Sequence, residues 1–576
     1  MRTDLLKQEI PHFIGVNLRQ DRMDLADEEL AKAINADMHA FLGSIYVRLG
    51  RSKQFSTALS NPNLRRIGKV NGSRYQIADR RVYRNQSLIG TLSGAGNDIS
   101  CIVPFRPLND STIWAFISDT GQMVKHDGSS VGVTNWGIVA PASAPSVAAS
   151  STGLTGLYSV VYTYARLTSD GALAHESSPS PISGAVTLAN QGIAITGIVP
   201  STDPQVTHTR IYRTVAGGAS YLFDQSITAP TTSVTTTTAD SALGTEVEDD
   251  NDPPPECSWA ALHNETMFLC GDPENPHYLW HSKRFHPEAV TEFVELGNAD
   301  DPLQCAVPTA GVLGAFARGN KYRVLGNGTQ GYVGIECLGK RGTPSPLAAV
   351  STEFGIVFVS KDGVYSTNLL APDLPIADDI LPLFYGESVN DLSALNWTYA
   401  SQFSAVAYKN RYYLGYVSGT NTAPDMVAVY SRDTKKWYFF EFPTKSFYVE
   451  EDIDSLVAGS NDGYVYTLES GNDDDDASIS MDVQTKDYHG ENSQQKKLFL
   501  YAKVDAYVPS GTLTASFHVD GTFKKAHTIT GDRTNINLRL PEKCIGRRWR
   551  MRLQYTGTGR AAVFGVSAMW LALGSA

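Results

Sequence analysis

Two stretches of this chain, FVSKDGVYSTN at residues 358–368 and VAGSNDGYVYTL at residues 457–468, repeat one pattern. Each has a short apolar run, a serine, an Asp-Gly pair and a second run that carries tyrosine. Asp-Gly is a strong hairpin signal because both residues tolerate the positive φ angles of tight turns. The pattern therefore predicts two equivalent β-hairpins, with turns at Asp362-Gly363 and at Asp462-Gly463.

Further segments alternate apolar and polar residues around turn-forming residues, which indicates more hairpins of the same kind. Three of these turns are expected at Asp119–Gly121, Lys409-Asn410 and Arg432–Thr434. Hairpins that recur along a chain are typical of the four-stranded blades of a β-propeller. We expect propeller parts at residues 56–140 and 256–470, and the irregular spacing leaves the blade number open.

Two more all-β modules are expected. Residues 141–255 open on a Pro/Ala/Ser linker, continue in short alternating segments and close on the acidic stretch EVEDDNDPPPE. This pattern predicts an inserted β-sandwich of the immunoglobulin/fibronectin III type. The alternation returns after the acidic run Asp473–Asp476, so residues 471–576 predict a C-terminal, jelly-roll-like β-sandwich.

Residues 1–55 differ from the rest of the chain because they contain a helical pattern. Asp27 is a suitable N-cap, acidic residues follow it, and Leu30, Ala33 and Ile34 have helical spacing. Extended segments flank this pattern. We expect an N-terminal arm with one helix that lies on another surface and does not form a domain of its own.

Composition excludes several classes of protein. The 576 residues carry a formal net charge of −12, so bulk positive charge does not hold this chain on nucleic acid. The six cysteines are scattered singly, which indicates reduced thiols made in a cytoplasm. The N-terminal residues lack a signal-peptide pattern, and no apolar run is long enough to span a membrane. We expect a soluble protein.

Three patterns that could carry chemistry are better explained as structure. The GxGxxG match at residues 326–331 is followed by a strand pattern, whereas a dinucleotide site needs a helix there. His277, His281 and His286 lack a carboxylate or cysteine at metal-ligand spacing. The two Asp-Gly phrases also depart from the S-x-D-x-G-x-x-W boxes of sialidases. We therefore expect no catalytic residues, no cofactor, no metal site and no enzyme.

A basic stripe is expected near the C-terminus, in the segment RRWRMRLQY. Arg548, Arg550 and Arg552 fall on one face of a strand, and Trp549, Met551 and Leu553 fall on the other. The apolar face belongs in the sandwich core. The arginine face is either a solvated surface or a docking surface for an acidic partner or DNA phosphate, to which guanidinium groups bind well.

Several phrases resemble those of short-tailed bacteriophage tail nozzle proteins, also called tail tubular protein B, whose relatives include packaged-DNA stabilisation proteins. The resemblance rests on GVNLR, DRMDLADEELAKAINAD and YVRLGRSKQF near the N-terminus, and on GTPSPLAAVSTEFGIVFVSKDGVYS in the propeller. The inserted GLYSVVYTYAR…GALAHESSPSP…HTRIYRT is similar to the immunoglobulin-like modules of phage virion proteins.

This resemblance implies a structural protein of the virion tail. Such proteins form a ring, commonly a hexamer, which continues the DNA channel below the head-to-tail adaptor, retains packaged DNA and carries fibres or spikes. The implied partners are further copies of the chain, the adaptor, a fibre or spike, dsDNA passing without sequence preference, and the host outer surface. The alternatives are a propeller that binds a receptor or glycan and, behind it, a propeller glycosidase.

Overall fold

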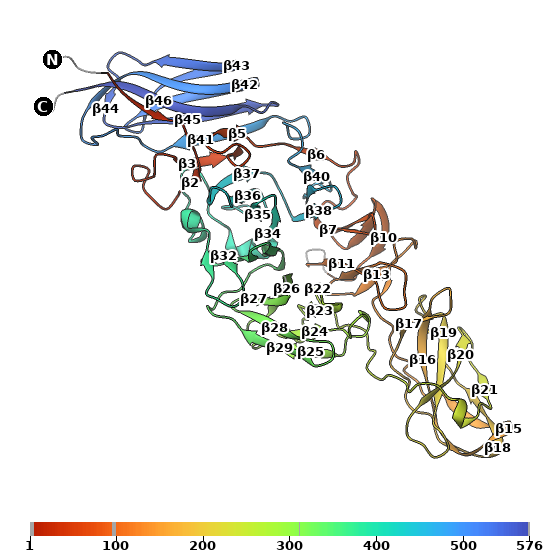
Figure 1. The fold of residues 1–576 in the computed structure, drawn as a ribbon. Helices are drawn as coiled ribbons and strands as arrows, with labels where there is room; N and C mark the ends of the chain where they lie inside the picture. Colours follow the sequence, from red (N-terminus) through yellow and green to blue (C-terminus); the bar gives the residue numbers. More distant parts are fainter. Residues whose placement is uncertain (1–4, 95–98, 310, 574–576) are drawn as a thin grey trace. The chain divides into compact units, whose positions relative to one another are not determined.

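The computed structural model describes residues 5–94, 99–309 and 311–573, without the side chains of residues 532–536 (Figure 1). The chain forms two compact units, Met1–Ile67 with Leu338–Ala576, and Gly68–Cys337. Strands dominate both units. The protein is therefore all-β, as the alternating sequence pattern predicts.

The described residues contain seven groups of four antiparallel strands of the kind that forms propeller blades; six of these groups are separate sheets, and one is part of a 15-stranded sheet. Four of them belong to the unit Gly68–Cys337, and the first strand of the first sheet begins just before it. Their strands are β7 (Leu64–Val70), β8 (Ser73–Ala78), β9 (Arg81–Arg84) and β10 (Ser87–Thr91); β11 (Cys101–Phe105), β12 (Trp114–Ser118), β13 (Val124–His126) and β14 (Thr134–Asn135); β22 (Trp259–His263), β23 (Thr266–Cys270), β24 (Tyr278–His281) and β25 (Glu292–Glu295); β26 (Leu303–Thr309), β27 (Val312–Ala317), β28 (Lys321–Asn327) and β29 (Gly331–Glu336).

The other three groups belong to the unit that contains both ends of the chain. Their strands are β30 (Ala349–Thr352), β31 (Gly355–Ser360), β32 (Gly363–Thr367) and β33 (Leu374–Pro375); β34 (Ser404–Tyr408), β35 (Arg411–Tyr416), β36 (Met426–Ser431) and β37 (Lys436–Glu441); β38 (Ser446–Glu450), β39 (Ser455–Gly459), β40 (Val465–Leu468) and β6 (Arg51–Lys53). Short helical turns η2 (Pro346–Ala348), η3 (Asp378–Ile380), α1 (Leu381–Phe384) and η4 (Trp397–Gln402) lie between these strands.

The last of these sheets takes its fourth strand from the N-terminal region. Strand β6 pairs with β40, with Arg51 opposite Leu468 and Lys53 opposite Tyr466. The Arg51 guanidinium lies 4.4 Å from the centre of the Tyr466 ring. This blade is therefore completed by a strand that lies about 400 residues earlier in the sequence than its other three strands.

The two Asp-Gly phrases lie at the same place in their sheets, between the second and third strands. In the first hairpin the turn lies one residue earlier than expected: Lys361 and Asp362 form it, and Gly363 is the first residue of β32 and pairs with Ser360. In the second hairpin Asp462 is in a longer turn and accepts hydrogen bonds from the Tyr464 amide (3.0 Å) and the Tyr466 hydroxyl (2.7 Å). The repeated phrase therefore marks equivalent positions in two blades.

The inserted module is a β-sandwich between β14 and β22. A three-stranded sheet of order β15-β18-β21 packs against a four-stranded sheet of order β17-β16-β19-β20. Tyr162, Ile193 and Ile211 are fully buried in its core. The strands are β15 (Ser146–Tyr158), β16 (Val160–Leu167), β17 (Leu173–Glu176), β18 (Val186–Thr196), β19 (His208–Arg213), β20 (Leu222–Thr228) and β21 (Val234–Thr236), and a short turn η1 (Asp240–Ala242) follows.

The C-terminal sandwich is built on one long hairpin, not on many short strands. Strand β42 (Lys497–Val519) pairs with β46 (Ala562–Ala572) along its first half and with β45 (Trp549–Gly557) along its second half. Stacking of Phe517 on Trp549 and a ring contact between Phe499 and Phe517 show that the two halves face each other. Strand β43 (Thr522–Arg539) is the second strand of the long hairpin and pairs with β42. The remaining strands are β41 (Ile479–Thr485) and β44 (Ile545–Gly546). The eight-stranded order of a jelly roll is replaced by long strands that serve both layers.

The prediction of a helix in the N-terminal arm is wrong, because this segment is the strand β3 (Glu29–Ile34). All six of its residues are buried, since the strand lies between β2 (Gly15–Val16) and β41 inside a sheet. Leu30, Ala33 and Ile34 match helical spacing only because both faces of this strand are covered. The side chain of Asp27 forms no helix cap and binds the Lys486 ammonium at 2.9 Å.

Candidate functional site

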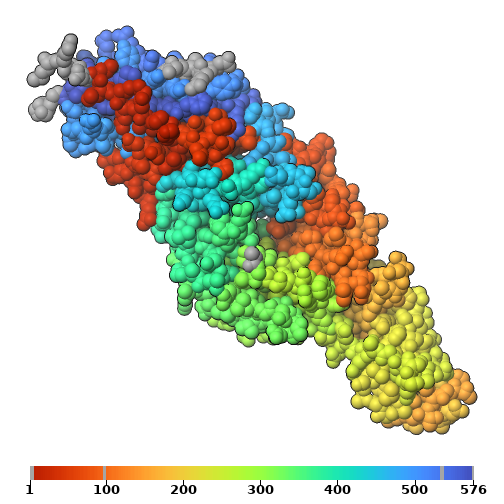
Figure 2. Space-filling model, in the orientation of Figure 1, coloured from red at the N-terminus to blue at the C-terminus, as the bar shows by residue number. Residues whose placement is uncertain are grey.

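The N-terminal segment joins a propeller blade to the C-terminal sandwich inside one unit. Strands β2 and β3 lie between β37 and β41, so one continuous sheet runs from the blade into the sandwich. Three more strands, β1 (Leu5–Ile10), β4 (Ala36–Asp37) and β5 (Ile45–Val47), extend the sandwich sheet beside β46. Figure 2 shows the red N-terminal residues lying against the blue C-terminal residues. We call residues 5–53 the N-terminal tie.

The phrase GVN in the tie has a structural reason for each residue. Gly15 lies so close to β37 that a Cβ there would stand 2.5 Å from the Lys436 Cβ. Val16 pairs with Trp437. The Asn17 amide donates to both Glu29 oxygens at 3.2 Å. Burial would raise the pKa of Glu29, but the Lys436 ammonium at 2.6 Å, together with hydrogen bonds from the Ala26 amide and Asn17, outweighs this effect and lowers that pKa.

The phrase RLG closes the other end of the tie. Arg48 is almost fully buried and binds Asp474 through two bonds, of 2.8 and 2.6 Å. Its Nε donates to the Asn35 side chain at 2.8 Å, and the Asn35 amide donates to the Ser480 carbonyl at 2.7 Å. A Cβ on Gly50 would lie 1.7 Å from the Asp473 carbonyl oxygen, so only glycine fits there. The acidic run Asp473–Asp476 therefore holds the tie and is not merely a solvated linker.

The expected alternation of the C-terminal basic stripe is present in and just before β45. Trp549, Met551 and Leu553 are fully buried in the sandwich core. The arginines between and before them, Arg548, Arg550 and Arg552, are half-buried on the opposite face. The stripe is therefore at the surface of the sandwich, where a partner can reach it.

Most of the positive charge of the stripe is balanced within the chain. Arg552 forms two bonds to Asp482 (2.8 and 2.7 Å), and Lys32 of the tie reaches the same carboxylate at 2.8 Å. Arg550 lies 3.7 Å from Asp487. Among the described residues, the Arg548 guanidinium has no ion pair; its backbone amide donates to Asp520 at 3.0 Å. Sequence alternation could not show these counter-charges, since they come from distant segments.

Two of the three clustered histidines and the glycine-rich loop line one pocket of about 400 Å³ in the unit Gly68–Cys337, whereas His277 lies outside it, 3.2 Å from Glu295. His281 and His286 lie beside Gly328 and Gly331. Burial lowers the pKa of both histidines. Residues 326–331 form the end of β28, the turn at 328–330 and the start of β29, as their strand pattern predicts. Across the described residues, no group of three or more His, Cys, Asp or Glu is placed to hold a metal ion.

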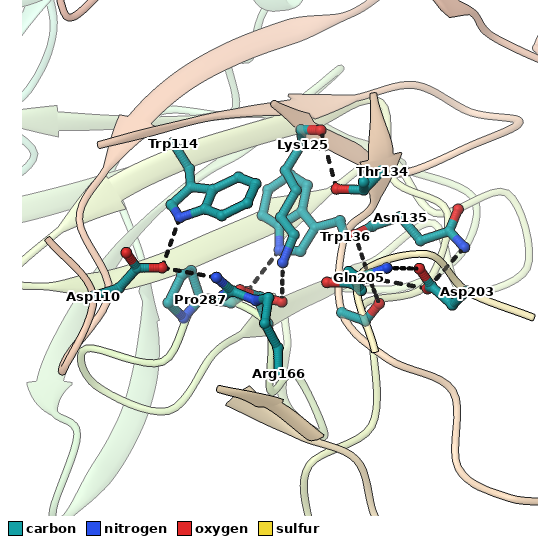
Figure 3. Close-up of polar contacts among 12 residues, drawn as sticks. Asp110, Trp114, Lys125, Thr134, Asn135, Trp136, Arg166, Asp203, Gln205 and Pro287 are labelled. Carbon is teal, nitrogen blue, oxygen red and sulfur yellow. Dashed lines mark hydrogen bonds and ion pairs between the residues drawn. The ribbon is translucent and has the colours of Figure 1, made fainter. Parts of the chain in front are cut away.

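A buried ionic cluster attaches the inserted sandwich to the blade β11–β14 (Figure 3). Arg166 of the sandwich binds Asp110 at 2.8 Å and Glu288 at 2.7 Å. Glu288 also accepts a hydrogen bond from Lys125. The Arg166 guanidinium and the Lys125 ammonium each lie 4.7 Å from the Trp114 ring. Two cations and two anions share one buried site, so their charges balance.

A second attachment lies beside this cluster. The Gln205 amide of the sandwich donates to the Gly137 carbonyl at 2.9 Å and the Asn135 carbonyl at 3.1 Å (Figure 3). The Trp136 indole donates to the Pro287 carbonyl at 2.7 Å. The insertion is therefore held by a specific polar surface, which the Pro/Ala/Ser linker in the sequence did not indicate.

A second pocket, of about 260 Å³, lies among three hairpin turns of neighbouring blades in the unit that contains both chain ends. The turns are β30–β31, β34–β35 and β36–β37, and two of them are the turns expected at Lys409-Asn410 and Arg432–Thr434. Aromatic and cationic side chains form its walls: Phe354, Tyr408, Tyr412, Tyr430, Lys409 and Arg432. We call it the turn pocket.

No profile of a known protein family matches this chain, and no curated protein matches it. Solved structures aligned to it include the computationally designed Ika8 protein (9% identity, 73% of this chain, 99% of that chain, TM-score 0.31). Another is an exo-β-1,3-galactanase from Phanerochaete chrysosporium (7% identity, 54% of this chain, 94% of that chain, TM-score 0.21). A third is YCF48 from Cyanidioschyzon merolae (9% identity, 53% of this chain, 94% of that chain, TM-score 0.25). Structural similarities this low indicate neither a substrate nor a partner for this chain.

Across the part of the chain that the structure describes, no helix is long and apolar enough to span a membrane.

Proposed function

We propose that this propeller protein is a structural component of a short-tailed phage tail, the nozzle. In this role it forms a ring, of which a hexamer is the expected form, that continues the DNA channel below the adaptor. The ring retains packaged DNA until infection and anchors fibres or spikes. The role is non-catalytic, and the chain is made in the host cytoplasm before it joins the virion.

The N-terminal tie is the observation that carries this proposal. The phrases that resemble nozzle proteins, GVN, the stretch around DEELAKAIN, and RLG, are the phrases that build the tie. Asn17, Asn35 and Arg48 each make a side-chain hydrogen bond that most other residue types would lose. At Gly15 and Gly50 any Cβ would clash with a neighbouring segment. Short phrases that share one structural task are a better basis for resemblance than phrases scattered over unrelated loops.

The charge of the chain supports the same role. A net charge of −12 makes the average surface repel phosphate, so DNA would pass along such a wall without adhering to it. The remaining positive surface near Arg548 is then free to contact an acidic partner protein.

The test is the assembly state of the full chain. Light scattering gives the mass in solution, and negative-stain images of the same sample show its shape. We expect closed rings with a central hole, formed by the chain alone or on addition of a purified portal–adaptor complex. A chain that stays monomeric both alone and with that complex would contradict the nozzle proposal.

A further inference from the structure

The turn pocket is formed by turns of two adjacent blades. Residues Glu353 and Phe354 come from the β30–β31 turn, and Lys409 and Asn410 come from the β34–β35 turn. Arg432 follows β36. The volume of the turn pocket, about 260 Å³, is close to the lower end of the range for small-molecule sites, about 300 Å³. One sugar-sized ligand therefore fits.

The walls combine apolar ring surface with hydrogen-bonding groups. Phe354 is 44% exposed although it is a large apolar side chain. Tyr408 and Tyr412 are buried beneath the opening, and Tyr430 is half-buried beside them. Aromatic rings offer flat apolar surface to the C–H face of a pyranose, and the polar groups around them fix its hydroxyls.

Two cations stand at the opening. The Arg432 guanidinium lies 4.7 Å from the Phe354 ring centre, and the Lys409 ammonium lies 4.7 Å from the Tyr408 ring centre. Each aromatic ring thus holds a cation in place beside the cavity. Lys409 and Arg432 have side-chain exposures of 51% and 49%, so both reach solvent and any ligand that enters.

Neither cation is strongly engaged within the chain. Arg432 lies 3.7 Å from Glu353, whose side chain is 88% exposed, and Lys409 lies 3.2 Å from Asp454, which is 68% exposed. Exposed ion pairs of this kind contribute only about 0–1 kcal/mol. A carboxylate on a ligand can therefore replace these partners, and Arg432 can bind it through two hydrogen bonds.

We propose that the turn pocket binds an acidic saccharide residue, a pyranose that carries a carboxylate. The carboxylate binds Arg432 and Lys409, and the ring packs on the exposed surface of Phe354. This binding activity goes beyond the nozzle role and does not depend on ring assembly, so either proposal can fail while the other holds.

The probes are methyl β-D-glucuronide and its neutral analogue methyl β-D-glucoside, titrated into the full chain by calorimetry and saturation-transfer NMR. We expect the glucuronide to bind with a Kd of about 1 mM and the glucoside at least about tenfold more weakly. Equal binding of the two sugars, or no saturable binding of the glucuronide, would overturn the proposal.

Variants locate the binding on the pocket. The double change Lys409→Gln with Arg432→Gln removes only exposed cations, and we expect it to abolish the preference for the acidic sugar. The matched control is Lys435→Gln, an exposed cation that follows Arg432 in the same turn but does not line the pocket. Phe354→Ala is expected to weaken both sugars. A double variant that binds the glucuronide like the control would refute the site.

Discussion

At the residue scale, the buried cluster of Asp110, Lys125, Arg166 and Glu288 sets how firmly the inserted sandwich is held. The Lys125 and Glu288 side chains are at most 2% exposed. Burial would raise the pKa of Glu288, but Lys125, His175 and Arg166 outweigh it and hold that pKa at about 2. Burial lowers the pKa of Lys125 to about 8 although Glu288 favours its charged form. The cluster is stable only as a complete set.

Removing one anion from the cluster should therefore be costly. Glu288→Gln keeps the size of the side chain but leaves Arg166 and Lys125 with less than their full counter-charge. Breaking a buried pair from one side typically costs about 3–5 kcal/mol. We expect a loss of that order in the free energy of unfolding, measured by urea titration of the full chain and followed by tryptophan fluorescence.

The matched control for this variant is Glu265→Gln. Its partner Arg284 lies at 2.9 Å, and both side chains are about half exposed. A pair of this kind should contribute at most about 1 kcal/mol. Similar losses in the two variants would show that burial of the cluster has no energetic consequence.

The cluster also predicts an acid-sensitive attachment. Burial lowers the pKa of His175 to about 4, below its ordinary value of 6.5, so His175 is neutral in the folded protein at pH 7. Between pH 6.5 and 4 the unfolded chain binds a proton that the folded chain does not, so stability falls as the pH falls. Protonation of Glu288 continues the loss below pH 4.5, toward its folded pKa of about 2.

Replacing this histidine should remove the first part of that loss. In His175→Gln we expect the unfolding free energy to become flatter between pH 6.5 and 4, by at most about 3 kcal/mol over the interval. The measurement is the urea midpoint at several pH values, with Glu288→Gln as the comparison below pH 4.5. An unchanged slope in His175→Gln would mean that this histidine is not the group that titrates.

At the element scale, the N-terminal tie is part of the fold and not an arm that waits for a partner. Its strand β3 is buried between β2 and β41, and β6 completes a blade. Val16, Leu30 and Ile34 belong to the same apolar core as the blade β34–β37 and the C-terminal sandwich. Removing residues 1–55 would therefore uncover both modules.

A single methyl group should be enough to loosen the tie. In Gly50→Ala the new Cβ would meet the Asp473 carbonyl oxygen at 1.7 Å, and neither backbone can yield without moving Arg48 away from Asp474. Overpacking of this kind costs about 1–3 kcal/mol. We expect a lower thermal midpoint of unfolding and greater proteolytic cleavage within the acidic run Asp473–Asp476.

Gly184→Ala is the control for this variant, because a Cβ there meets nothing within 4 Å. This variant should change the free energy of unfolding by no more than about 0.5 kcal/mol, so its thermal midpoint should stay close to that of the unmodified chain. A Gly50→Ala protein as stable as this control would show that β6 is not tightly held by the acidic run.

Hairpins were predictable from the sequence because their turns are local. Asp520-Gly521 has φ angles of 46° and 79°, so both residues adopt the left-handed conformation that the Asp-Gly pair favours. The strand β3 was not predictable, since burial on both faces removes the alternation by which a strand is recognised. Local spacing then favoured a helix that tertiary packing overrides.

The candidate sites were predictable only in part, because they join distant segments. The face on which Arg550 and Arg552 lie follows from period-two alternation. Their counter-charges Asp482 and Asp487 belong to β41 and the loop that follows it, so spacing along β45 cannot show them. Two turns of the turn pocket were expected, at Lys409-Asn410 and at Arg432–Thr434, but the β30–β31 turn was not, and their convergence depends on which blades are neighbours.

At the scale of the whole molecule, the basic face is reduced to a small positive area. Asp482 and Asp487 balance most of the charge of Arg550 and Arg552. Arg548 and the exposed Arg547 remain for a partner. If this area docks against an acidic surface in the assembled tail, association should weaken as salt screens it.

A charge reversal at Arg548 tests this docking. Arg548→Glu changes a half-buried side chain without an ion pair among the described residues, so the sandwich should fold with an unchanged thermal midpoint. We expect at least a tenfold loss of association, about 1.4 kcal/mol, in ring assembly or in binding to the adaptor, measured by mass photometry at two salt concentrations. Lys361→Glu, an exposed cation in the β31–β32 turn, gives the same change in net charge and should assemble normally. Equal assembly of the two variants would make the arginine face a solvated surface, and the contacts of a ring would then have to lie elsewhere on the chain.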